Sequence, residues 1–403
     1  MIGRSRCSRR SVVAMRNQAQ IPTRAEVGHC GVLRHLLKSA VIALAAMSAP
    51  GCGFNPDADG QSHPASNGNG NHTTADHSVP APQEVPVTTM PRPHENERPT
   101  VSKSTNAKGD RFLIVHADDV GMCKSVNRAT IEALERGIVT SASIMVPCPA
   151  FEEFAEYARE HPEYDYGIHL TLNAEFKSYR WGPVLPAEEV PSLIDENGYL
   201  WEFENQVAAN VRTDDVEREL TAQIDRALER GIKLSHLDTH MGALFTRRDL
   251  VEIYVNLGLK YDLPILFERD DGEPAFAMPP EVRAGIGDIV RTLEEHRLPV
   301  LDNLVLRYAP DRVNDNRRFY VNTLRTLPAG VSEIIIHCGY HNRELNNITG
   351  SSYMRDVDRQ IFTDDATAEE ISRLGIRLVN WKQFHEMAPA DGKPVDSSQS
   401  NSK

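Results

Sequence analysis

The alternation of two kinds of segment constrains the fold of this chain more than any other feature. Short apolar segments that favour β-strands, beginning with RFLIVHA at residues 111–117, alternate with amphipathic segments that favour helices, beginning with SVNRATIEALERG at 125–137. Repeated alternation of this kind implies a parallel sheet covered by helices. Residues 109–387 have the length of one such α/β domain, and the strand count favours a TIM-like (β/α) barrel, which can be incomplete or distorted. No GxGxxG motif follows the first strand, which disfavours a dinucleotide-binding fold.

Further strands are expected along this domain, and one long insertion interrupts it. The expected strands cover residues 139–146, 165–172, 232–240, 263–268, 299–304, 332–338 and 376–381. After the third strand, between residues 173 and 211, the alternation breaks, and this stretch carries Phe176, Tyr179, Trp181, Tyr199, Trp201 and Phe203. Such an insertion is commonly a functional loop or lid. Its aromatic rings either stack on a sugar or another flat substrate, or pack in a small cluster of their own.

The first 52 residues have the pattern of an export signal. Residues 1–38 are basic, with Glu26 as the single acidic residue, and the apolar run SAVIALAAMSA follows at 39–49. A basic segment before a short apolar run is typical of a secretory signal, and this run is too short to span a bilayer comfortably. Cys52, preceded by Gly51, resembles the modified cysteine of a bacterial lipoprotein signal, although Ala49 and Pro50 depart from that pattern. The alternative is a buried apolar helix.

Two polar segments flank the expected domain. Residues 53–108 are rich in Pro, Gly, Asn and Ser, and residues 388–403 are similarly polar. Segments of this composition bury too little apolar surface to order themselves, so we expect a disordered linker and a disordered tail. The chain is therefore expected to be exported, either periplasmic or anchored to the membrane through its N-terminus.

Charge and cysteine content exclude some classes of function. The net charge of -13 argues against nucleic acid as a partner, because phosphate binding requires a basic surface. The six cysteines show no spacing typical of zinc fingers or of a disulfide framework. We expect Cys123, Cys148 and Cys338 to be buried free thiols. The oligomeric state is left open by the sequence.

Polar side chains fall at the ends of several expected strands. In α/β barrels the chemistry lies at the carboxyl ends of the strands, so side chains there meet at one rim. A single histidine in such a place is commonly a core residue, but four strands that end this way indicate a shared site. Asp and His side chains together favour an open site for a divalent ion such as zinc. The strand ends in question carry His116, Asp118 and Asp119; His169; His236, Asp238 and His240; and His337.

Four motifs resemble the ChbG/YdjC-like carbohydrate deacetylases in order and spacing. They are ADDVGMCKSVNRATIEALERGIVTSASIMV at 117–146, YGIHLTL at 166–172, SHLDTH at 235–240 and EIIIHCGY at 333–340. The resemblance covers residues 111–387. It implies a TIM-like barrel similar in design to polysaccharide deacetylases, and removal of an N-acetyl group from an acetylated amino sugar such as a chitooligosaccharide. It also implies one divalent metal ion, Mg or Zn.

The same resemblance implies a role for individual residues. Asp119, His169 and His240 match the metal ligands of the family. Asp118 matches the general base that takes a proton from water, and His337 the general acid that protonates the leaving amine. Arg269 falls near a family arginine that orients the base. Asp238 is expected to hold a ligand histidine by its other ring nitrogen, while His116 and His236 are expected to support the site or the core.

This chain departs from the family pattern at two places. Met241-Gly242-Ala243 stands where the family commonly has further histidines, and Cys338 stands where it commonly has proline. Both changes are expected to alter the floor of the substrate site, and neither removes a ligand. Two other functions stay open at this point. One is a different metal hydrolase on the same barrel, such as a phosphoesterase, and the other is a non-catalytic carbohydrate-binding surface protein.

Overall fold

The computed structural model describes residues 109–269, 275–307 and 313–388. The expected export signal (1–52), the linker (53–108) and all but the first residue of the tail (388–403) lie outside these residues. Among the described residues, no helix combines the length and the apolar character needed to cross a membrane.

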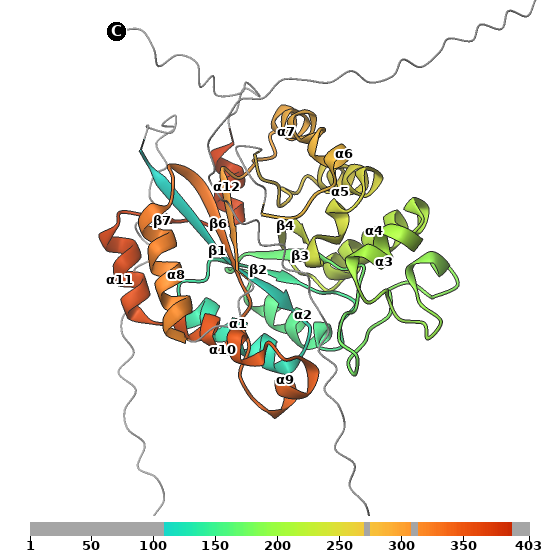
Figure 1. The fold of residues 1–403 in the computed structure, drawn as a ribbon, viewed down its shortest axis with the longest axis horizontal. Coiled ribbons are helices and arrows are strands. Elements are labelled where there is room, and N and C mark those ends of the chain that lie inside the picture. The colour runs from blue at the N-terminus through green and yellow to red at the C-terminus, as the bar shows by residue number, and fades with distance from the viewer. Residues whose placement is uncertain (1–108, 270–274, 308–312, 389–403) are drawn as a thin grey trace, which may run out of the picture. The chain divides into compact units, whose positions relative to one another are not determined.

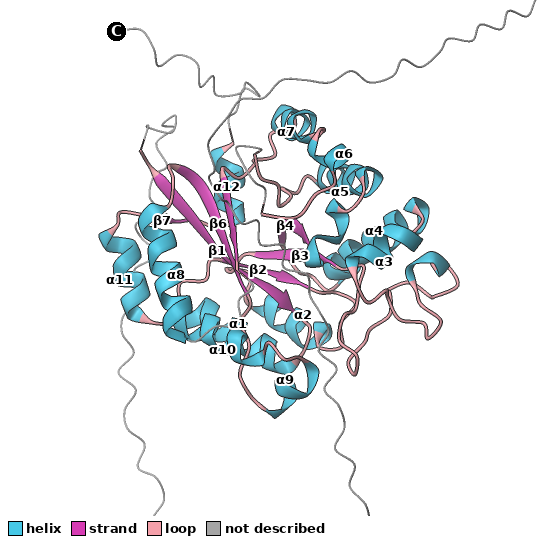
Figure 2. Cartoon of the chain, viewed as in Figure 1, coloured by secondary structure: helices cyan, strands magenta, loops and turns pink. Residues whose placement is uncertain are grey.

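A parallel sheet forms the centre of the domain (Figure 1). Neighbouring strands are hydrogen-bonded in the order β4-β3-β2-β1-β6-β5. The short strand β7 pairs with β1 and stands outside this order. Because parallel neighbours need crossover connections, helices surround the sheet (Figure 2). The strands are β1 (Arg111–Val120), β2 (Ser141–Ile144), β3 (Tyr166–Leu170), β4 (Leu234–Thr239), β5 (Asn303–Leu306), β6 (Gly330–Ile336) and β7 (Arg377–Leu378).

The helices follow the strands in the expected rhythm. Their bounds are α1 (Lys124–Arg136), α2 (Phe151–Glu160), α3 (Glu204–Asn210), α4 (Thr213–Glu229), α5 (Arg248–Tyr261), α6 (Pro280–Arg283), α7 (Ile286–Glu295), α8 (Val313–Thr326), α9 (Arg343–Ile348), α10 (Ser352–Phe362), α11 (Asp365–Arg373) and α12 (Trp381–Met387). The short 3-10 helices are η1 (Pro191–Leu193) and η2 (His240–Phe245).

The segment between β4 and β5 makes the barrel incomplete. Residues 263–268, expected as a strand, form only isolated parallel bridges, from Ile265 to Leu237 in β4 and from Glu268 to Leu301 just before β5. The Leu266 amide donates to the Leu237 carbonyl at 2.8 Å, and the Leu301 amide donates to the Phe267 carbonyl at 2.9 Å. This segment therefore spans the gap between the two edges of the sheet without becoming a regular strand. The expected strand at 376–381 is likewise reduced to the two residues of β7.

The inward face of the sheet is divided into an apolar layer and a polar layer. Residues two apart on a strand share a face. On β1, Phe112 and Ile114 belong to a buried apolar cluster that also contains Trp381 and Phe384 of α12. His116 and Asp118 continue the same face toward the carboxyl end of the strand and are also buried. The interior is thus closed by apolar side chains at one end and becomes polar toward the other.

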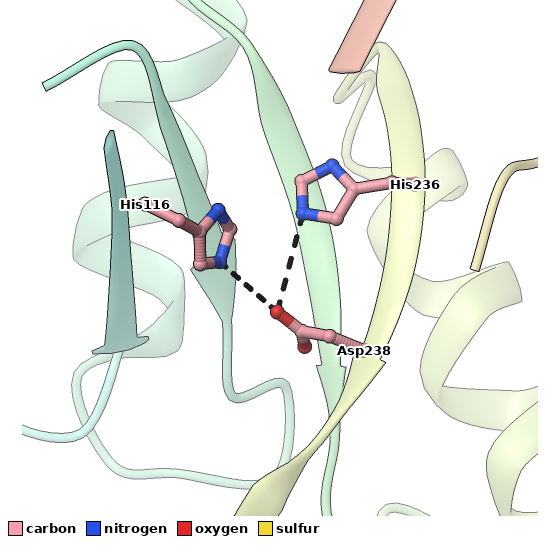
Figure 3. A group of neighbouring side chains, drawn as sticks. All are labelled: His116, His236 and Asp238. Atoms are coloured by element: carbon pink, nitrogen blue, oxygen red, sulfur yellow. Dashed lines mark ion pairs between the residues drawn. The ribbon is translucent and has the colours of Figure 1, made fainter. Parts of the chain in front are cut away.

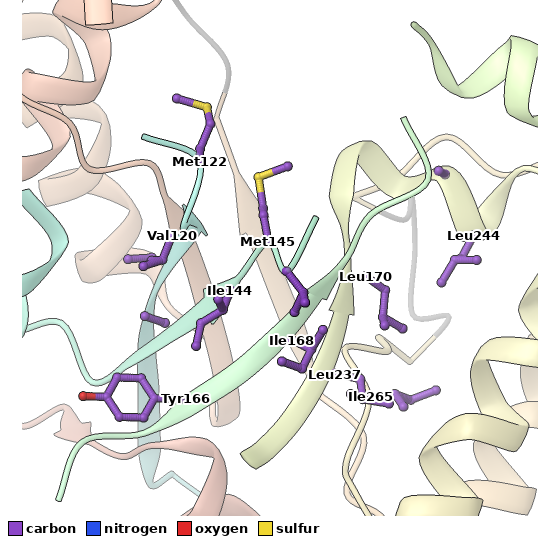
Figure 4. Packing of buried hydrophobic residues seen from close by; sticks show 14 of the residues in the cluster. Val120, Met122, Ile144, Met145, Tyr166, Ile168, Leu170, Leu237, Leu244 and Ile265 are labelled. Atoms are coloured by element: carbon purple, nitrogen blue, oxygen red, sulfur yellow. The ribbon is translucent and has the colours of Figure 1, made fainter. Parts of the chain in front are cut away.

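The outward face packs against the helices in the main core, which is the larger of the two buried apolar clusters. Val120, Ile144 and Ile168 from three neighbouring strands lie in it, with Met145 and Leu170 beside them (Figure 4). Each such side chain contributes about 1.5–3 kcal/mol on full burial. This packing holds the strand ends, and the polar residues on them, in fixed positions.

The aromatic insertion is packed against the domain. Trp181 is buried in the main core together with Leu193 and Leu200, so these side chains do not form a separate cluster. The carboxylate of Glu219, on α4, accepts hydrogen bonds from the Val184 amide at 2.8 Å and the Leu185 amide at 3.0 Å. The insertion is therefore fastened to the domain by both apolar contacts and buried hydrogen bonds. Tyr199 and Phe203 are its exposed aromatic side chains.

Candidate metal and catalytic site

The carboxyl end of β1 brings two adjacent carboxylates to one place. The pairing of β1 with β2 shifts register between Ala117 and Val120, and Asp119 has a φ of 67°, in the left-handed region. Neighbours on a regular strand point to opposite faces, and this irregularity turns both Asp118 and Asp119 toward the site. The turn that follows is fixed by Asn127 of α1, whose Oδ1 accepts the Gly121 amide at 2.8 Å.

Three side chains, two at the ends of β1 and β3 and one directly after β4, converge on one point. Asp119 Oδ1 lies 3.4 Å from His169 Nε2 and 3.3 Å from His240 Nδ1. All three residues are buried, and neither Asp119 Oδ1 nor His169 Nε2 has a hydrogen-bond partner in the described part of the chain. Separations of this size suit ligand atoms that surround one ion at about 2.0–2.2 Å. The residues present therefore fit a divalent metal, and the predicted ligands Asp119, His169 and His240 are brought together.

Each of these three side chains is held from behind by a charged partner. His169 Nδ1 lies 2.7 Å from Asp238 Oδ1, which is the arrangement expected from the sequence. His240 Nε2 lies 3.0 Å from Glu175 Oε2 in the insertion. Arg355 of α10 donates from Nη2 to Asp119 Oδ2 at 2.6 Å. Carboxylates on the outer nitrogens of histidine ligands fix the ring orientation and make the ligand more basic.

The electrostatics of the site follow from these contacts. Burial by itself would raise the pKa of Asp119, but the Arg355 guanidinium and the two imidazoles hold that pKa well below its ordinary value. Burial would lower the pKa of His240, but the Glu175 and Asp119 carboxylates raise it to about 9. A metal ion binding here must therefore displace a proton from His240, as metal binding to histidine generally requires.

Asp118 and His337 lie beside this point. Asp118 Oδ2 is 3.8 Å from His169 Nε2 and 3.9 Å from His337 Nε2. The backbone amide of His337 donates to Asp358 Oδ2 at 3.2 Å, which anchors the end of β6 to α10. Burial lowers the pKa of His337, Asp119 opposes the shift and Arg355 adds to it, and together they bring the pKa to about 4. The imidazole of His337 is therefore neutral at pH 7 before substrate binds.

Arg269 is not brought to the site. Its guanidinium pairs with Glu294 of α7 at 2.6 Å and with Asp302 at 3.4 Å. Asp302 in turn accepts the Val331 amide near the start of β6, whereas His337 follows the end of that strand. Arg269 therefore lies at the opposite end of the sheet from Asp118. The arginine that contacts a site carboxylate is Arg355, and its partner is Asp119.

Sequence reasoning also missed Glu175, Arg355 and Asp358. Arg355 and Asp358 are buried charged residues on the same face of α10 as Val357 and Ile361, a pattern that marks a helix turned toward a polar site. Glu175 gave no comparable signal, because it lies in an insertion without periodicity. Cys338 is buried in the main core, beside His337 in the sequence. Cys123, Cys148 and Cys338 are buried free thiols, as expected.

Comparison with known proteins identifies the family of the chain. A model of the family of YdjC-like proteins matches residues 112–373. A carbohydrate deacetylase of Geobacillus stearothermophilus is 31% identical over 282 residues, which cover 69% of this chain and 99% of that protein. Another, from Thermoanaerobacter pseudethanolicus, is 29% identical over 271 residues and covers 67% of this chain and 98% of its own length.

A solved structure supports the same conclusion. A protein of Enterococcus faecalis, described as a cellobiose-phosphate cleavage protein, superposes with a TM-score of 0.57 at 27% identity. The match covers 68% of this chain and 99% of that one. The two chains thus share a fold over most of the length of that protein. This chain belongs to the YdjC-like family, whose similar curated members are carbohydrate deacetylases.

Proposed function

We propose that this chain removes N-acetyl groups from an acetylated amino sugar or oligosaccharide, such as a chitooligosaccharide, with the help of one divalent ion, Zn or Mg. The observation that carries the proposal is the convergence of Asp119 Oδ1, His169 Nε2 and His240 Nδ1 beside a further carboxylate, Asp118. Family membership supports deacetylation of a carbohydrate. The donor set of two imidazoles and one carboxylate supports the metal.

Asp118 is the proposed general base. A divalent ion, when bound to the three ligands, would polarise the acetyl carbonyl and lower the pKa of a nearby water. Asp118 faces the same point as His169 Nε2, at 3.8 Å, and is therefore placed to take a proton from that water. The other oxygen of this carboxylate, Oδ1, lies 3.1 Å from His116 Nε2.

His337 is the proposed general acid. Its Nε2 lies 3.9 Å from Asp118 Oδ2, so the proposed general acid and the proposed general base are neighbours. Because the pKa of His337 is lowered to about 4, the imidazole is neutral at rest, with a proton on only one ring nitrogen, and it must gain a second proton during the reaction. A group with so low a pKa then releases its proton readily to the departing amine.

The direct test is acetate release from short N-acetylglucosamine oligomers by the full chain supplied with Zn²⁺. Asp118→Asn should lower kcat by about 10²–10⁴-fold, the usual contribution of a general base, without loss of bound metal. Asp214→Asn changes an exposed carboxylate on α4 and should leave kcat unchanged. Full kcat in metal-loaded Asp118→Asn would show that Asp118 is not the base. Phosphate release from phosphate esters, or sugar binding without turnover under every metal, would favour the two other functions.

Export is also part of the proposal, on the basis of residues 1–52. The basic segment, the apolar run at 39–49 and Cys52 together support a signal that is cleaved or lipid-modified. Mass spectrometry of the mature N-terminus tests it. A chain that begins at Cys52 with an added lipid mass supports the membrane anchor, a chain cleaved nearby supports secretion, and an intact N-terminus contradicts export.

A further inference from the structure

A second group of buried side chains that could bind a metal lies in the barrel interior, between the apolar layer and the candidate site. His236 and Asp238 project from β4 and His116 projects from β1, with both imidazoles directed at the same carboxylate oxygen (Figure 3). His116 Nε2 lies 3.0 Å from Asp238 Oδ2, and His236 Nε2 lies 4.0 Å from it. His116 and His236 are completely buried, and Asp238 is nearly so.

The hydrogen bonds around His236 determine which of its nitrogens carries the proton. Its Nδ1 lies 2.8 Å from Ser235 Oγ. That hydroxyl also lies 2.8 Å from Asp165 Oδ1 and 2.9 Å from the Tyr166 carbonyl, and both of these are acceptors that compete for its single proton. The hydroxyl oxygen must therefore accept a hydrogen bond from His236 Nδ1. This leaves a lone pair on His236 Nε2, which points into the interior.

Two acceptors then face each other without a donor between them. His236 Nε2 has no hydrogen-bond partner among the described residues, and the 4.0 Å gap to Asp238 Oδ2 is too long for a hydrogen bond. A proton on His116 Nε2 would serve Asp238 Oδ2 at 3.0 Å or Asp118 Oδ1 at 3.1 Å, but it leaves His236 Nε2 unsatisfied. A cation bound here would take the place of that proton. Glu333 of β6 is almost completely buried, and neither of its carboxyl oxygens has a hydrogen-bond partner in the described part of the chain. Burial raises the pKa of Glu333 to about 8. The lone pair of His236 Nε2 is therefore left unsatisfied by the described residues, which is costly in a dry interior.

The position of His236 is built into the backbone. A Cβ atom on Gly167 of β3 would lie 2.3 Å from His236 Nε2, so the imidazole occupies space that only glycine leaves open. Trp381 of α12 stacks on the other side of the ring, with centroids 5.0 Å apart and planes 14° from parallel. The ring is thus held rigidly with its lone pair aimed at Asp238.

We propose that His116, His236 and Asp238 form a second, structural cation site, distinct from the one at Asp119, for a first-row divalent ion such as Zn²⁺. A cation satisfies three lone pairs at once, whereas a water molecule donates only two hydrogen bonds. Two imidazoles and one carboxylate favour Zn²⁺ over Mg²⁺ or Ca²⁺, which prefer oxygen ligands. The proposed ion lies on the side of the Asp119 site that faces the apolar layer, and we assign it a structural role. It would fix Asp238, whose other oxygen holds His169.

The test is the number of zinc ions per chain. The full chain is stripped with a chelator, reloaded with Zn²⁺, desalted and analysed by elemental mass spectrometry. We expect two ions in the wild type, one in His236→Gln, one in His240→Ala and none in the double variant. His296→Gln, which changes an exposed histidine after α7, should retain two. One ion in the wild type, with the same ion retained in His236→Gln, would overturn the proposal.

A second measurement does not depend on the folding of a variant. Anomalous diffraction from zinc-loaded wild-type crystals should show a peak within bonding distance of His236 Nε2, and the absence of that peak would contradict the site. The two proposals fail separately. A zinc ion at His236 in a chain that releases no acetate would refute only the deacetylase activity, and an active chain with one zinc ion would refute only the second site.

Discussion

Glu175 connects the insertion to the candidate metal site through a single contact. Its carboxylate lies 3.0 Å from His240 Nε2, the nitrogen that faces away from Asp119. Glu175→Gln keeps a polar group of the same size but removes the charge. We expect the dissociation constant for Zn²⁺ at the Asp119 site to rise about 10- to 100-fold, the usual effect of losing the partner of a ligand histidine.

Isothermal titration of the metal-free protein measures this change. Glu188→Gln alters an exposed carboxylate in the same insertion and serves as the matched control, with no expected change in affinity. If Glu175→Gln bound zinc as tightly as the wild type, the carboxylate would not support His240.

At the scale of residues, the site was predictable where it depends on strand ends. Asp119, His169 and His240 each follow or end a strand, and barrel geometry alone brings the carboxyl ends of strands together. Arg355 could not be placed in the same way, because it reaches Asp119 from a helix far along the chain. Arg269 was assigned to the wrong end of the sheet because the course of its segment is not visible in the sequence. The segment that carries it crosses from β4 to the start of β5, so its last residue lies far from the rim.

Strand β3 approaches β4 closely enough to require glycine at one position. A Cβ on Gly167 would lie 2.3 Å from His236 Nε2, and His236 is held on its other face by Trp381. Gly167→Ala should therefore lower the free energy of unfolding by about 1–3 kcal/mol, as overpacking of a core does. Urea denaturation measures the loss.

Gly287→Ala is the matched control for this change. No atom lies within 4 Å of a Cβ built on Gly287, which sits in α7. Alanine in a helix is favoured over glycine by about 0.5–1 kcal/mol, so this variant should be as stable as the wild type or more stable. Equal stability of Gly167→Ala and the wild type would mean that His236 is free to move.

Helix α10 carries a buried carboxyl whose titration should be visible in stability. Asp358 accepts hydrogen bonds from the His337 amide at 3.2 Å and from the Tyr320 hydroxyl at 3.0 Å. Burial nevertheless raises the pKa of Asp358 to about 7. Between about pH 4 and pH 7 the folded chain keeps this proton while the unfolded chain has lost it. The contribution of Asp358 to stability therefore falls as pH rises, by up to about 1.4 kcal/mol per pH unit.

Denaturation of the wild type and of Asp358→Asn at several pH values tests this expectation. The difference in free energy of unfolding between them should change across this range and become constant above about pH 7. A constant difference from pH 4 to pH 8 would show that Asp358 is ionised in the folded protein.

At the scale of elements, periodicity predicted the strand–helix order well and failed where no periodicity exists. Helix α1 lies where the amphipathic segment at 125–137 was expected. Residues 263–268 are apolar enough for a strand, but their neighbours pair with them at single points, so they form bridges only. The role of the insertion was not predictable either. Its contacts with α4 depend on the buried carboxylates Asp215 and Glu219, which sequence alone does not distinguish from exposed ones.

For the whole molecule, the barrel explains how residues distant in sequence form one site. The polar inward residues of β1, β3, β4 and β6 meet above an apolar layer closed by α12. Asp119 and Arg355 lie at opposite ends of the domain sequence and are joined at 2.6 Å. A divalent ion bound by side chains at the ends of three strands would therefore link these strands and also supply the chemistry of the site. Its removal should abolish activity.

The measurement that tests this claim most directly is acetate release from N-acetylglucosamine oligomers by metal-stripped protein as Zn²⁺ is added back. Activity should be absent without metal and should rise until the Asp119 site is filled. His240→Ala, which removes one ligand, should stay inactive at Zn²⁺ concentrations that saturate the wild type. Acetate release by the metal-free chain, or full activity of His240→Ala, would contradict the account.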